Sequence, residues 1–200
     1  MKATCIVGSP RPQGSCGYLI DTLIKGMNEG SAESKRQHAS RADLLVKKYC
    51  VGEAEIRYCL GCKKCYIDGK CVQQDEVEKI VTDILDSDYV VIAAPSYWAD
   101  VPGQLKTFFD RNTPYGDTNA NRILKASKPI KGIGIAVRAG RNEQENTILL
   151  DAISHYFGHL GIEMIKRISI CETNTLDDLL QKHEKEIQEI YLLGKELTNI

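Results

Sequence analysis

Cysteine is the residue type that stands out in this sequence, because four of its eight cysteines lie within thirteen consecutive positions. The four follow the spacing C-x2-C-x2-C-x5-C and are Cys59, Cys62, Cys65 and Cys71. Three thiolates spaced by two residues can surround one side of an iron–sulfur cubane, and the fourth can close it after a turn at 68–69. Nearby basic residues would offset the negative charge of the thiolates: Arg57, Lys63, Lys64 and Lys70.

The spacing leaves three interpretations of this segment open. Its last gap is five residues and Val72 follows it, which departs from the bacterial ferredoxin pattern with its shorter gap and proline. Zinc sites more often combine two separated C-x2-C pairs. The segment therefore predicts a [4Fe–4S] cluster, a zinc ion or a group of free redox-active thiols.

A second candidate site is the polar loop at 8–17, which joins a β-branched run to an amphipathic segment. The hydroxyls of Ser9 and Ser15, the guanidinium of Arg11 and the N–H groups of a helix start could converge on a phosphate monoester. The loop matches neither a Walker A motif nor a G-x-G-x-x-G fingerprint, which disfavours ATP and dinucleotides. The alternative is a plain Gly/Pro turn.

Two further loops carry residues that could bind a ligand. Tyr97 and Trp98 are adjacent aromatics in a polar loop after an apolar run, a placement suited to stacking on a flat heterocycle. They could instead anchor a subunit interface. The loop at 137–142 carries Arg138 and Arg141, which are either solvated or placed to meet an anion.

The elements that must position these loops alternate between short apolar runs and amphipathic segments. Strands are predicted at 4–7, 42–46, 89–94, 130–137 and 162–170, and helices from about 18, 75, 102, 142 and 175. This alternation predicts right-handed crossovers and a parallel α/β sheet with helices on both faces. Ligands of such sheets bind beyond the carboxyl ends of the strands, where these loops lie. The cysteine loop would leave the second strand at that same edge.

Composition limits the class of protein. The 200 residues fit one domain, 1–200, with a cysteine-rich loop at 50–73; 42% are hydrophobic and 26% charged, as in soluble globular proteins. A net charge of −1 argues against nucleic acid as a partner. The longest apolar run, 89–95, is far below the about 20 residues of a membrane span. The first residues do not form a signal peptide, so we expect a cytoplasmic protein.

Several motifs together resemble the NADPH-dependent FMN reductase family over about residues 1–165. They are Gly8-Ser9-Pro10-Arg11 with Gly14-Ser15, then Pro95-x-Tyr97-Trp98 with Pro102, Lys106, Asp110 and Arg111. The resemblance implies a flavodoxin-like three-layer fold whose five-stranded parallel sheet has the order 2-1-3-4-5. It also implies an FMN-dependent NAD(P)H oxidoreductase that forms a homodimer or homotetramer.

The resemblance assigns residues to the flavin residue by residue. Positions implied at the FMN phosphate are Ser9, Arg11, Ser15, Cys16 and Gly17. Positions implied along the isoalloxazine are Pro95, Ser96, Tyr97 and Trp98. Positions implied at its other edge are Arg138, Ala139 and Gly140. Cys16 stands where the family more often has threonine, and 138–141 matches loosely.

The cysteine segment resembles the motif of iron–sulfur flavoproteins, a branch of that family with a [4Fe–4S] cluster. Family members without a cluster can carry a similar run. The sequence therefore supports an FMN-dependent NAD(P)H oxidoreductase, an iron–sulfur flavoprotein that takes electrons from ferredoxin, or a non-enzymatic electron carrier. It leaves open the small-molecule or protein acceptor and the choice between NADH and NADPH.

Overall fold

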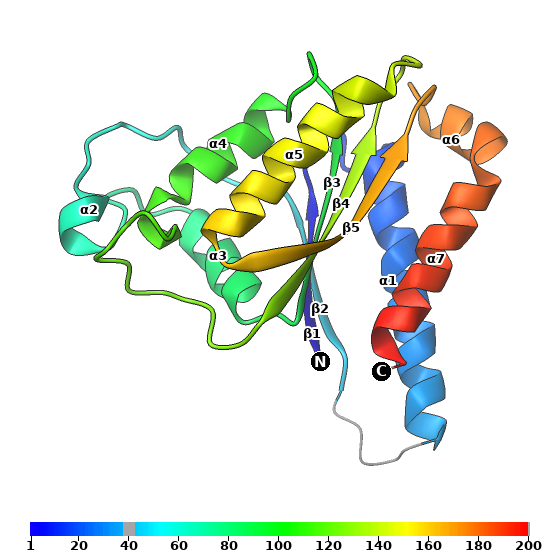
Figure 1. Cartoon of the computed structure of the whole chain (residues 1–200), viewed down its shortest axis with the longest axis horizontal. Coiled ribbons are helices and arrows are strands. Elements are labelled where there is room, and N and C mark those ends of the chain that lie inside the picture. Colours follow the sequence, from blue (N-terminus) through cyan, green and yellow to red (C-terminus); the bar gives the residue numbers. More distant parts are fainter. Residues whose placement is uncertain (38–42, 200) are drawn as a thin grey trace.

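The computed structural model describes residues 1–37 and 43–199. Its centre is a five-stranded sheet in which every neighbouring pair of strands is parallel and the order is β2-β1-β3-β4-β5, as predicted (Figure 1). The strands are β1 (Lys2–Val7), β2 (Leu45–Cys50), β3 (Tyr89–Pro95), β4 (Ile130–Val137) and β5 (Ile162–Ile170).

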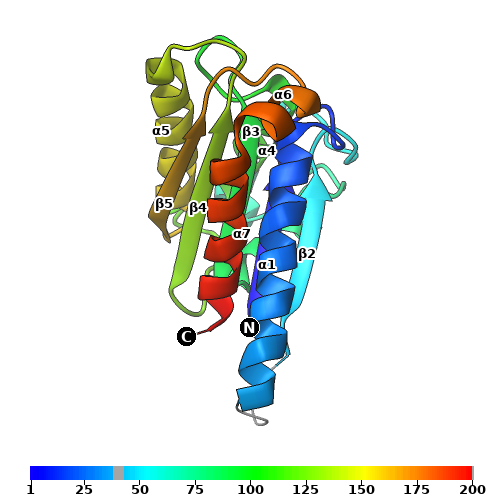
Figure 2. The ribbon, with the colours of Figure 1, turned by 90° about the vertical axis from the view of Figure 1, so that its right-hand side faces the viewer.

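Helices cover both faces of this sheet and give three layers (Figures 1 and 2). One apolar core joins the sheet to α3 (Val77–Leu85), α4 (Gly103–Arg111) and α5 (Glu143–His159). The other core joins it to α1 (Ser15–Gln37), α6 (Leu176–Lys182) and α7 (Glu184–Thr198). Two short helices, α2 (Cys65–Asp68) and η1 (Thr113–Tyr115), lie outside these layers. The flavodoxin-like arrangement expected from the sequence is therefore present.

The burial of the central strands explains why they could be predicted from the sequence. Residues 89–94 of β3 are all buried, because helices cover both sides of that strand. On β4, a Cβ added to Gly132 would lie 2.5 Å from the Phe157 ring, so α5 can pack this closely only against glycine. The tightly packed strands β3 and β4 therefore fix the starting points of the loops that follow them.

The first helix is longer than the sequence predicted. The charge pattern of 31–41 indicates a loop with the end of the helix frayed into it, but α1 continues to Gln37, and positions 38–41 lie outside the described residues. Alanine, glutamate and lysine in this stretch favour a helix. Small residues let α7 pack directly on it, since a Cβ on Gly26 would lie 2.1 Å from the Tyr191 carbonyl oxygen. Figure 2 shows α1 and α7 side by side. A contact between two helices about 160 residues apart in the sequence cannot be recognised from a local sequence pattern.

Two other boundaries differ from the prediction. The second strand was predicted at 42–46 and runs from Leu45 to Cys50; position 42 lies outside the described residues. The lysines of this strand made it hard to recognise in the sequence, because an edge strand can expose charged side chains. The last helix starts at Thr175 as predicted, where a capping box is present, but it breaks at His183. Among the described helices, none combines the length and apolar character that crossing a membrane requires.

Candidate functional site

Backbone hydrogen bonds bring the loops at the carboxyl ends of the strands to one edge of the sheet. The N–H of Gly8 donates to Ala93 O at 2.8 Å, and the N–H of Ser96 donates to Val137 O at 2.8 Å. The N–H of Arg138 donates to Ile170 O at 2.9 Å. The sheet therefore fixes the relative positions of these loops, and we call this region the strand-end edge: residues 8–14, 96–100, 138–142 and 171–175.

A small pocket at this edge gathers part of the predicted phosphate site. The predicted residues that line it are Ser9, Arg11, Ser15, Cys16 and Pro95. The segment 173–176 forms another wall, which the sequence analysis did not include. The signal for it was available, because Thr175 begins a capping box directly after the fifth strand. The other predicted flavin residues lie outside this pocket.

The loop at 8–17 has the geometry of an anion cradle. The N–H of Arg11 donates to Ser9 Oγ at 3.0 Å, which folds the loop back on itself. A Cβ on Gly17 would lie 1.7 Å from Pro12 O, so the loop can wrap the start of α1 only with glycine there. The first N–H groups of a helix have no partner within it and carry its positive dipole end. An anionic phosphate suits this cradle, with the exposed Arg11 beside it.

Two predicted phosphate residues have side chains that are already engaged elsewhere. Ser15 Oγ donates to Thr175 O at 3.1 Å and thereby ties the helix start to the loop after β5. The Cys16 thiol is buried in the apolar core, and this burial raises its pKa to about 12. Cys16 can therefore serve an anion only through its backbone N–H, and the cysteine-for-threonine departure costs one side-chain donor.

The aromatic residues of the second loop stand on a strained turn. The N–H of Tyr97 donates to Asp100 O and that of Asp100 to Tyr97 O, at 3.0 and 3.1 Å. Between them Trp98 and Ala99 have φ angles of 57° and 61°, a conformation that non-glycine residues rarely adopt. Tyr97 is 43% exposed and Trp98 is 100% exposed. The turn projects from the upper edge in Figure 1. The exposure of both side chains places their rings outside the core.

Three polar side chains of the strand-end edge differ in exposure and in pairing. Ser96 Oγ is buried without a hydrogen-bond partner, so it is available to a ligand atom at the edge of a ring. Arg138 is paired, because its Nη1 lies 2.8 Å from Glu145 Oε2 and donates to Asn142 O at 2.6 Å. Arg141 pairs with Glu172 at 2.7 Å. The main chain of this segment is partly engaged as well, because the Thr173 N–H donates to Arg138 O and the Glu172 N–H donates to Gly140 O. What the segment can offer a ligand is therefore the N–H groups of Ala139 and Gly140, while the charge of Arg138 is already compensated.

The four clustered cysteines line one pocket. Its other walls include Asp110, Arg111, Thr113 and Pro114. The pKa of the Cys65 thiol is raised, first by burial and then by the charges of the other three cysteines. In residues 1–37 and 43–199, however, no three histidine, cysteine, aspartate or glutamate side chains are arranged to hold one metal ion. The donor set suits a thiolate-bound metal, with Cys59 and Cys62 exposed and Cys65 and Cys71 half-buried.

The cysteine loop begins where the sequence predicted, but its pocket lies away from the strand-end edge. The loop leaves β2 at the strand-end edge, but it runs to the opposite end of α4, where Figure 1 places α2. The aromatic turn precedes the first residue of α4, whereas Arg111 is its last. A helix of nine residues is about 13 Å long, so the two regions are a helix length apart within one chain.

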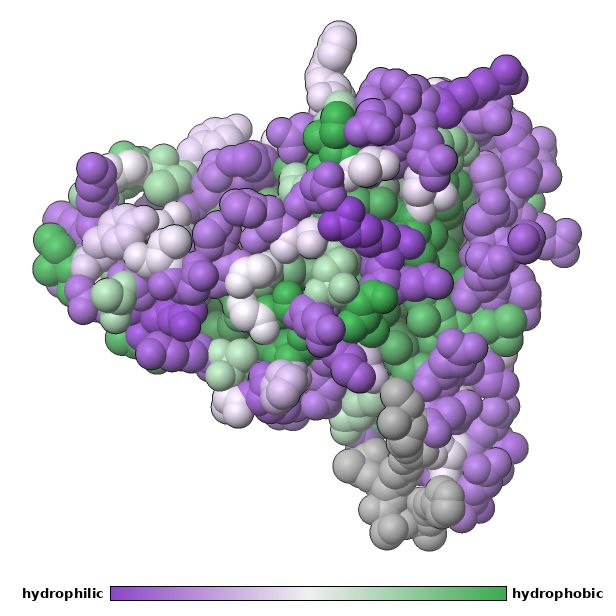
Figure 3. Space-filling model, viewed as in Figure 1, coloured by the Kyte–Doolittle hydropathy of each residue, from purple (hydrophilic) through white to green (hydrophobic). Residues whose placement is uncertain are grey.

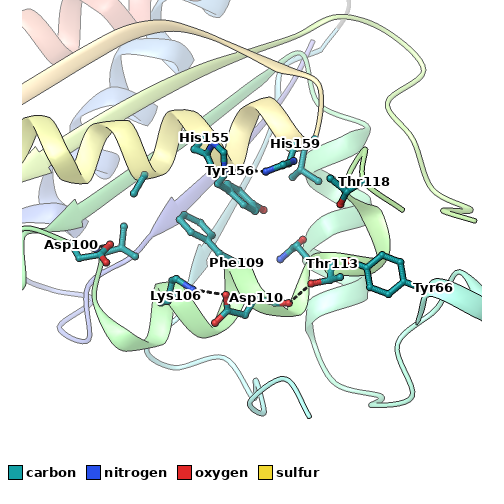
Figure 4. Close-up of a pocket in the computed structure, with 15 residues that line it drawn as sticks. Tyr66, Asp100, Lys106, Phe109, Asp110, Thr113, Thr118, His155, Tyr156 and His159 are labelled. Carbon is teal, nitrogen blue, oxygen red and sulfur yellow. Dashed lines mark hydrogen bonds and ion pairs between the residues drawn. The ribbon is translucent and has the colours of Figure 1, made fainter. Parts of the chain in front are cut away.

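A cavity of about 380 Å³ lies between α4 and α5 and was not predicted (Figure 4). Phe109 and Tyr156 stack in it with ring centroids 3.9 Å apart. His159 Nδ1 lies 2.7 Å from Asp117 Oδ1, and its Nε2 lies 3.1 Å from His155 Nε2. Both histidines retain exposure to solvent. Figure 3 shows the mixed polar and apolar surface on this side of the molecule.

Comparisons with known proteins add family relationships to this geometry. The family model described as NADPH-dependent FMN reductase matches residues 1–166. An iron–sulfur flavoprotein of Archaeoglobus fulgidus is 35% identical over 116 residues, which are 58% of this chain and 47% of that protein. An iron–sulfur flavoprotein of Methanocaldococcus jannaschii is 32% identical over 149 residues, 74% of this chain and 68% of that protein. The chain thus spans about half the length of the first of these relatives.

Solved structures confirm the fold. A structure described as an FMN-dependent NADH-azoreductase from Bacillus anthracis, in complex with FMN, covers 100% of both chains with a TM-score of 0.67. Its sequence is 15% identical to this one. Agreement over the full length at such low identity shows that the flavodoxin-like layers are shared while most side chains differ.

Proposed function

The chain belongs to the NADPH-dependent FMN reductase family, and on that premise we propose that it is an FMN-dependent NAD(P)H oxidoreductase. The observation that carries this proposal is the anion cradle of loop 8–17 beside the outward-facing aromatic turn at 97–100. Phosphate and a flat ring system are the two ends of FMN, and the strand-end edge offers one surface for each. Bound FMN would supply hydride acceptance from NAD(P)H and electron transfer to an acceptor.

The chain's own residues hold the phosphate end of the cofactor. The N–H groups at the start of α1 donate to the phosphate, and Arg11 compensates its charge. Ser9 keeps the loop folded through its bond with the Arg11 N–H and retains a hydroxyl hydrogen to donate. Gly17 lets the loop close over the helix start, and Cys16 contributes its N–H alone.

Other residues of the strand-end edge orient the ring system. Tyr97 and Trp98 give the ring an apolar neighbour and exclude water from one side of it. The unpartnered hydroxyl of Ser96 would be available to a polar atom of the ring, and the N–H groups of Ala139 and Gly140 would be available to another. Pro95 ends the buried strand and sets the direction in which the turn leaves it.

Anaerobic reduction tests this function directly. FMN-loaded protein is mixed with NADPH or NADH without oxygen, and the flavin absorbance is followed. We expect at least one of the two nucleotides to bleach the flavin and added acceptor to restore it. Bleaching by dithionite but by neither nucleotide would overturn the proposal and favour a ferredoxin-dependent flavoprotein or a non-enzymatic electron carrier.

A second function is favoured by the shared pocket of the four cysteines. Cys59, Cys62, Cys65 and Cys71 would hold a [4Fe–4S] cluster, which the names of the relatives support, and the electron donor would then be a ferredoxin. Anaerobic reconstitution with iron and sulfide should load the wild type, while Cys62→Ser should lose iron and keep FMN. Binding of zinc in preference to iron, or of neither metal, would contradict this candidate.

Association and location complete the proposal. The exposed Trp98 ring and the open cavity between α4 and α5 suit contacts between copies, so we expect a homodimer or homotetramer. None of the eight cysteines, all of which lie in the described residues, forms a disulfide, which suits the reducing cytoplasm. Light scattering of the FMN-loaded protein gives the mass directly, and a monomer at micromolar concentration would contradict the first expectation.

A further inference from the structure

Arg111 at the end of α4 is a buried arginine that the flavin site does not use. Its side chain and that of Asp75 are each 1% exposed. Nη1 lies 2.6 Å from Asp75 Oδ2, and Nη2 lies 3.1 Å from Asp75 Oδ1. This two-point pairing fixes the guanidinium plane, because both oxygens of the carboxylate accept from it.

The pair closes the neck of the cysteine loop, by which we mean residues 58–74. Arg111 Nη1 also donates to Arg57 O at 2.7 Å, and the Arg57 N–H donates to Asp75 Oδ2 at 3.2 Å. The residue before the loop and the residue after it are therefore held together on one side chain of α4. Three further bonds extend this neck: Glu55 N to Glu76 Oε2, Glu76 N to Glu55 O, and Gln73 Nε2 to Tyr58 O.

The far side of the cysteine loop is held by asparagines rather than by cysteines. Asn119 Nδ2 donates to Cys65 O at 3.0 Å, and Asn121 Nδ2 donates to Tyr66 O at 2.6 Å. Gly69 lies so close that a Cβ there would be 2.2 Å from Asn121 O. The loop thus has fixed ends and a fixed tip without any contribution from a thiol.

Arg111 is also part of the wall of the cysteine pocket. It lines that pocket together with all four cysteines. Arg111 Nε is buried and has no hydrogen-bond partner. A buried N–H of a cation without an acceptor is unfavourable, and a pocket that gains thiolate charge would compensate it.

We propose that Arg111 is a positioning residue for the four-cysteine pocket. Through Asp75 and the Arg57 carbonyl it holds the neck of the loop closed before any metal binds, and its guanidinium stabilises the thiolate charge of the metal-loaded pocket. This inference rests on the metal-binding candidate proposed above and adds the residue that prepares the site. Such outer partners orient ligands and tune metals although they do not touch the ion.

Cobalt titration separates positioning from mere stability. Co2+ is added anaerobically to reduced, metal-free, FMN-loaded protein, and the thiolate-to-cobalt absorption band reports binding. In Arg111→Met/Asp75→Leu the whole ion pair becomes apolar, a change that buried pairs often tolerate without loss of stability. Arg111→Lys keeps the charge but not the two-point geometry, and Lys70→Met removes an exposed cation of the same loop.

We expect the double variant to keep its circular dichroism and FMN content but to bind Co2+ at least about tenfold more weakly than the wild type. Arg111→Lys should recover part of that loss, and Lys70→Met should stay within about twofold of the wild type. Equal Co2+ affinity in the double variant and the wild type would show that the ion pair is purely structural. That result would overturn the positioning role of Arg111 but not the metal-binding candidate. Absence of a thiolate band in the wild type would overturn the metal-binding candidate as well.

Discussion

The strand-end edge and the cysteine loop are held by different kinds of interaction. Main-chain hydrogen bonds that continue the ladders of β1, β3, β4 and β5 fix the edge, so its loops inherit the stability of the sheet. The cysteine loop instead depends on Arg111, Asp75, Asn119 and Asn121. The chain therefore holds two sites that are stabilised independently of each other. Changes at one should leave the other intact.

The largest expected effect comes from breaking the neck of the cysteine loop on one side only. Arg111→Met leaves the Asp75 carboxylate buried without its partner, which should lower the free energy of unfolding by about 3–5 kcal/mol. Urea unfolding of wild type, Arg111→Met and Arg111→Met/Asp75→Leu measures this. The double variant should regain most of the loss. A single variant as stable as the wild type would show that the ion pair does not hold the loop.

The next effect concerns the strand-end edge alone. Gly17→Ala places a Cβ against Pro12 O, so the loop at 8–17 must move away from the start of α1. Overpacking of this kind costs about 1–3 kcal/mol, which corresponds to a loss of FMN affinity of about tenfold to a hundredfold if the loop moves. Titration of FMN and of Co2+ into the same variant separates the two sites. Weaker binding of both FMN and Co2+ would contradict the independence of the two sites.

A smaller effect is expected at the tip of the cysteine loop. Asn119→Ala/Asn121→Ala removes the amide donors to Cys65 O and Tyr66 O, each worth about 1 kcal/mol. Co2+ affinity should fall by about tenfold, while the FMN dissociation constant should not change. Asn174→Ala, an exposed asparagine at the strand-end edge, is the matched control for the cobalt titration. Unchanged cobalt binding in the double variant would show that the neck alone positions the thiols.

The smallest effect is a dependence of stability on pH. Burial raises the pKa of Asp75, but the Arg111 guanidinium and the N–H groups of Arg57 and Val77 outweigh it and leave the pKa below its ordinary value. A lowered pKa stabilises the fold above the unfolded-state pKa near 3.8, and this contribution is lost as the pH falls through the folded-state value.

Acid unfolding checks this sign. Between pH 5 and about pH 2, the wild type should lose more stability than Arg111→Met/Asp75→Leu, in which the titrating group is absent. Parallel curves for the two proteins would show that Asp75 titrates alike in the folded and unfolded states.

The sequence predicted the strand-end edge better than the cysteine loop, and the reason is locality. The apolar run 89–94, the Asn142 cap and the Thr175 capping box are patterns of adjacent residues, and each lies where it was expected. Parallel topology then places the loops together without further information. The segment 173–176 was missed only because the fifth strand was not included among those that end at the site.

The neck of the cysteine loop could not be predicted, because it joins residues far apart in the sequence. Asp75 stands at the predicted start of a helix, and its Oδ1 does accept from the Val77 N–H at 3.2 Å. The same carboxylate also pairs with Arg111, 36 residues away. From the sequence, Arg111 was noted only as part of a family motif, and that motif assigned no role to it. Such pairings follow from packing and not from spacing.

The measurement that tests the central claim most directly is the FMN dissociation constant of Ser9→Ala/Arg11→Ala. The wild type and Ser31→Ala/Arg36→Ala, with the same changes further along α1, serve as controls in the same calorimetric titration. We expect FMN to bind the Ser9/Arg11 variant at least about tenfold more weakly, because a charge-assisted contact to phosphate is lost, and the control to match the wild type. Equal FMN affinity in all three proteins would contradict the assignment of the strand-end edge as the FMN site.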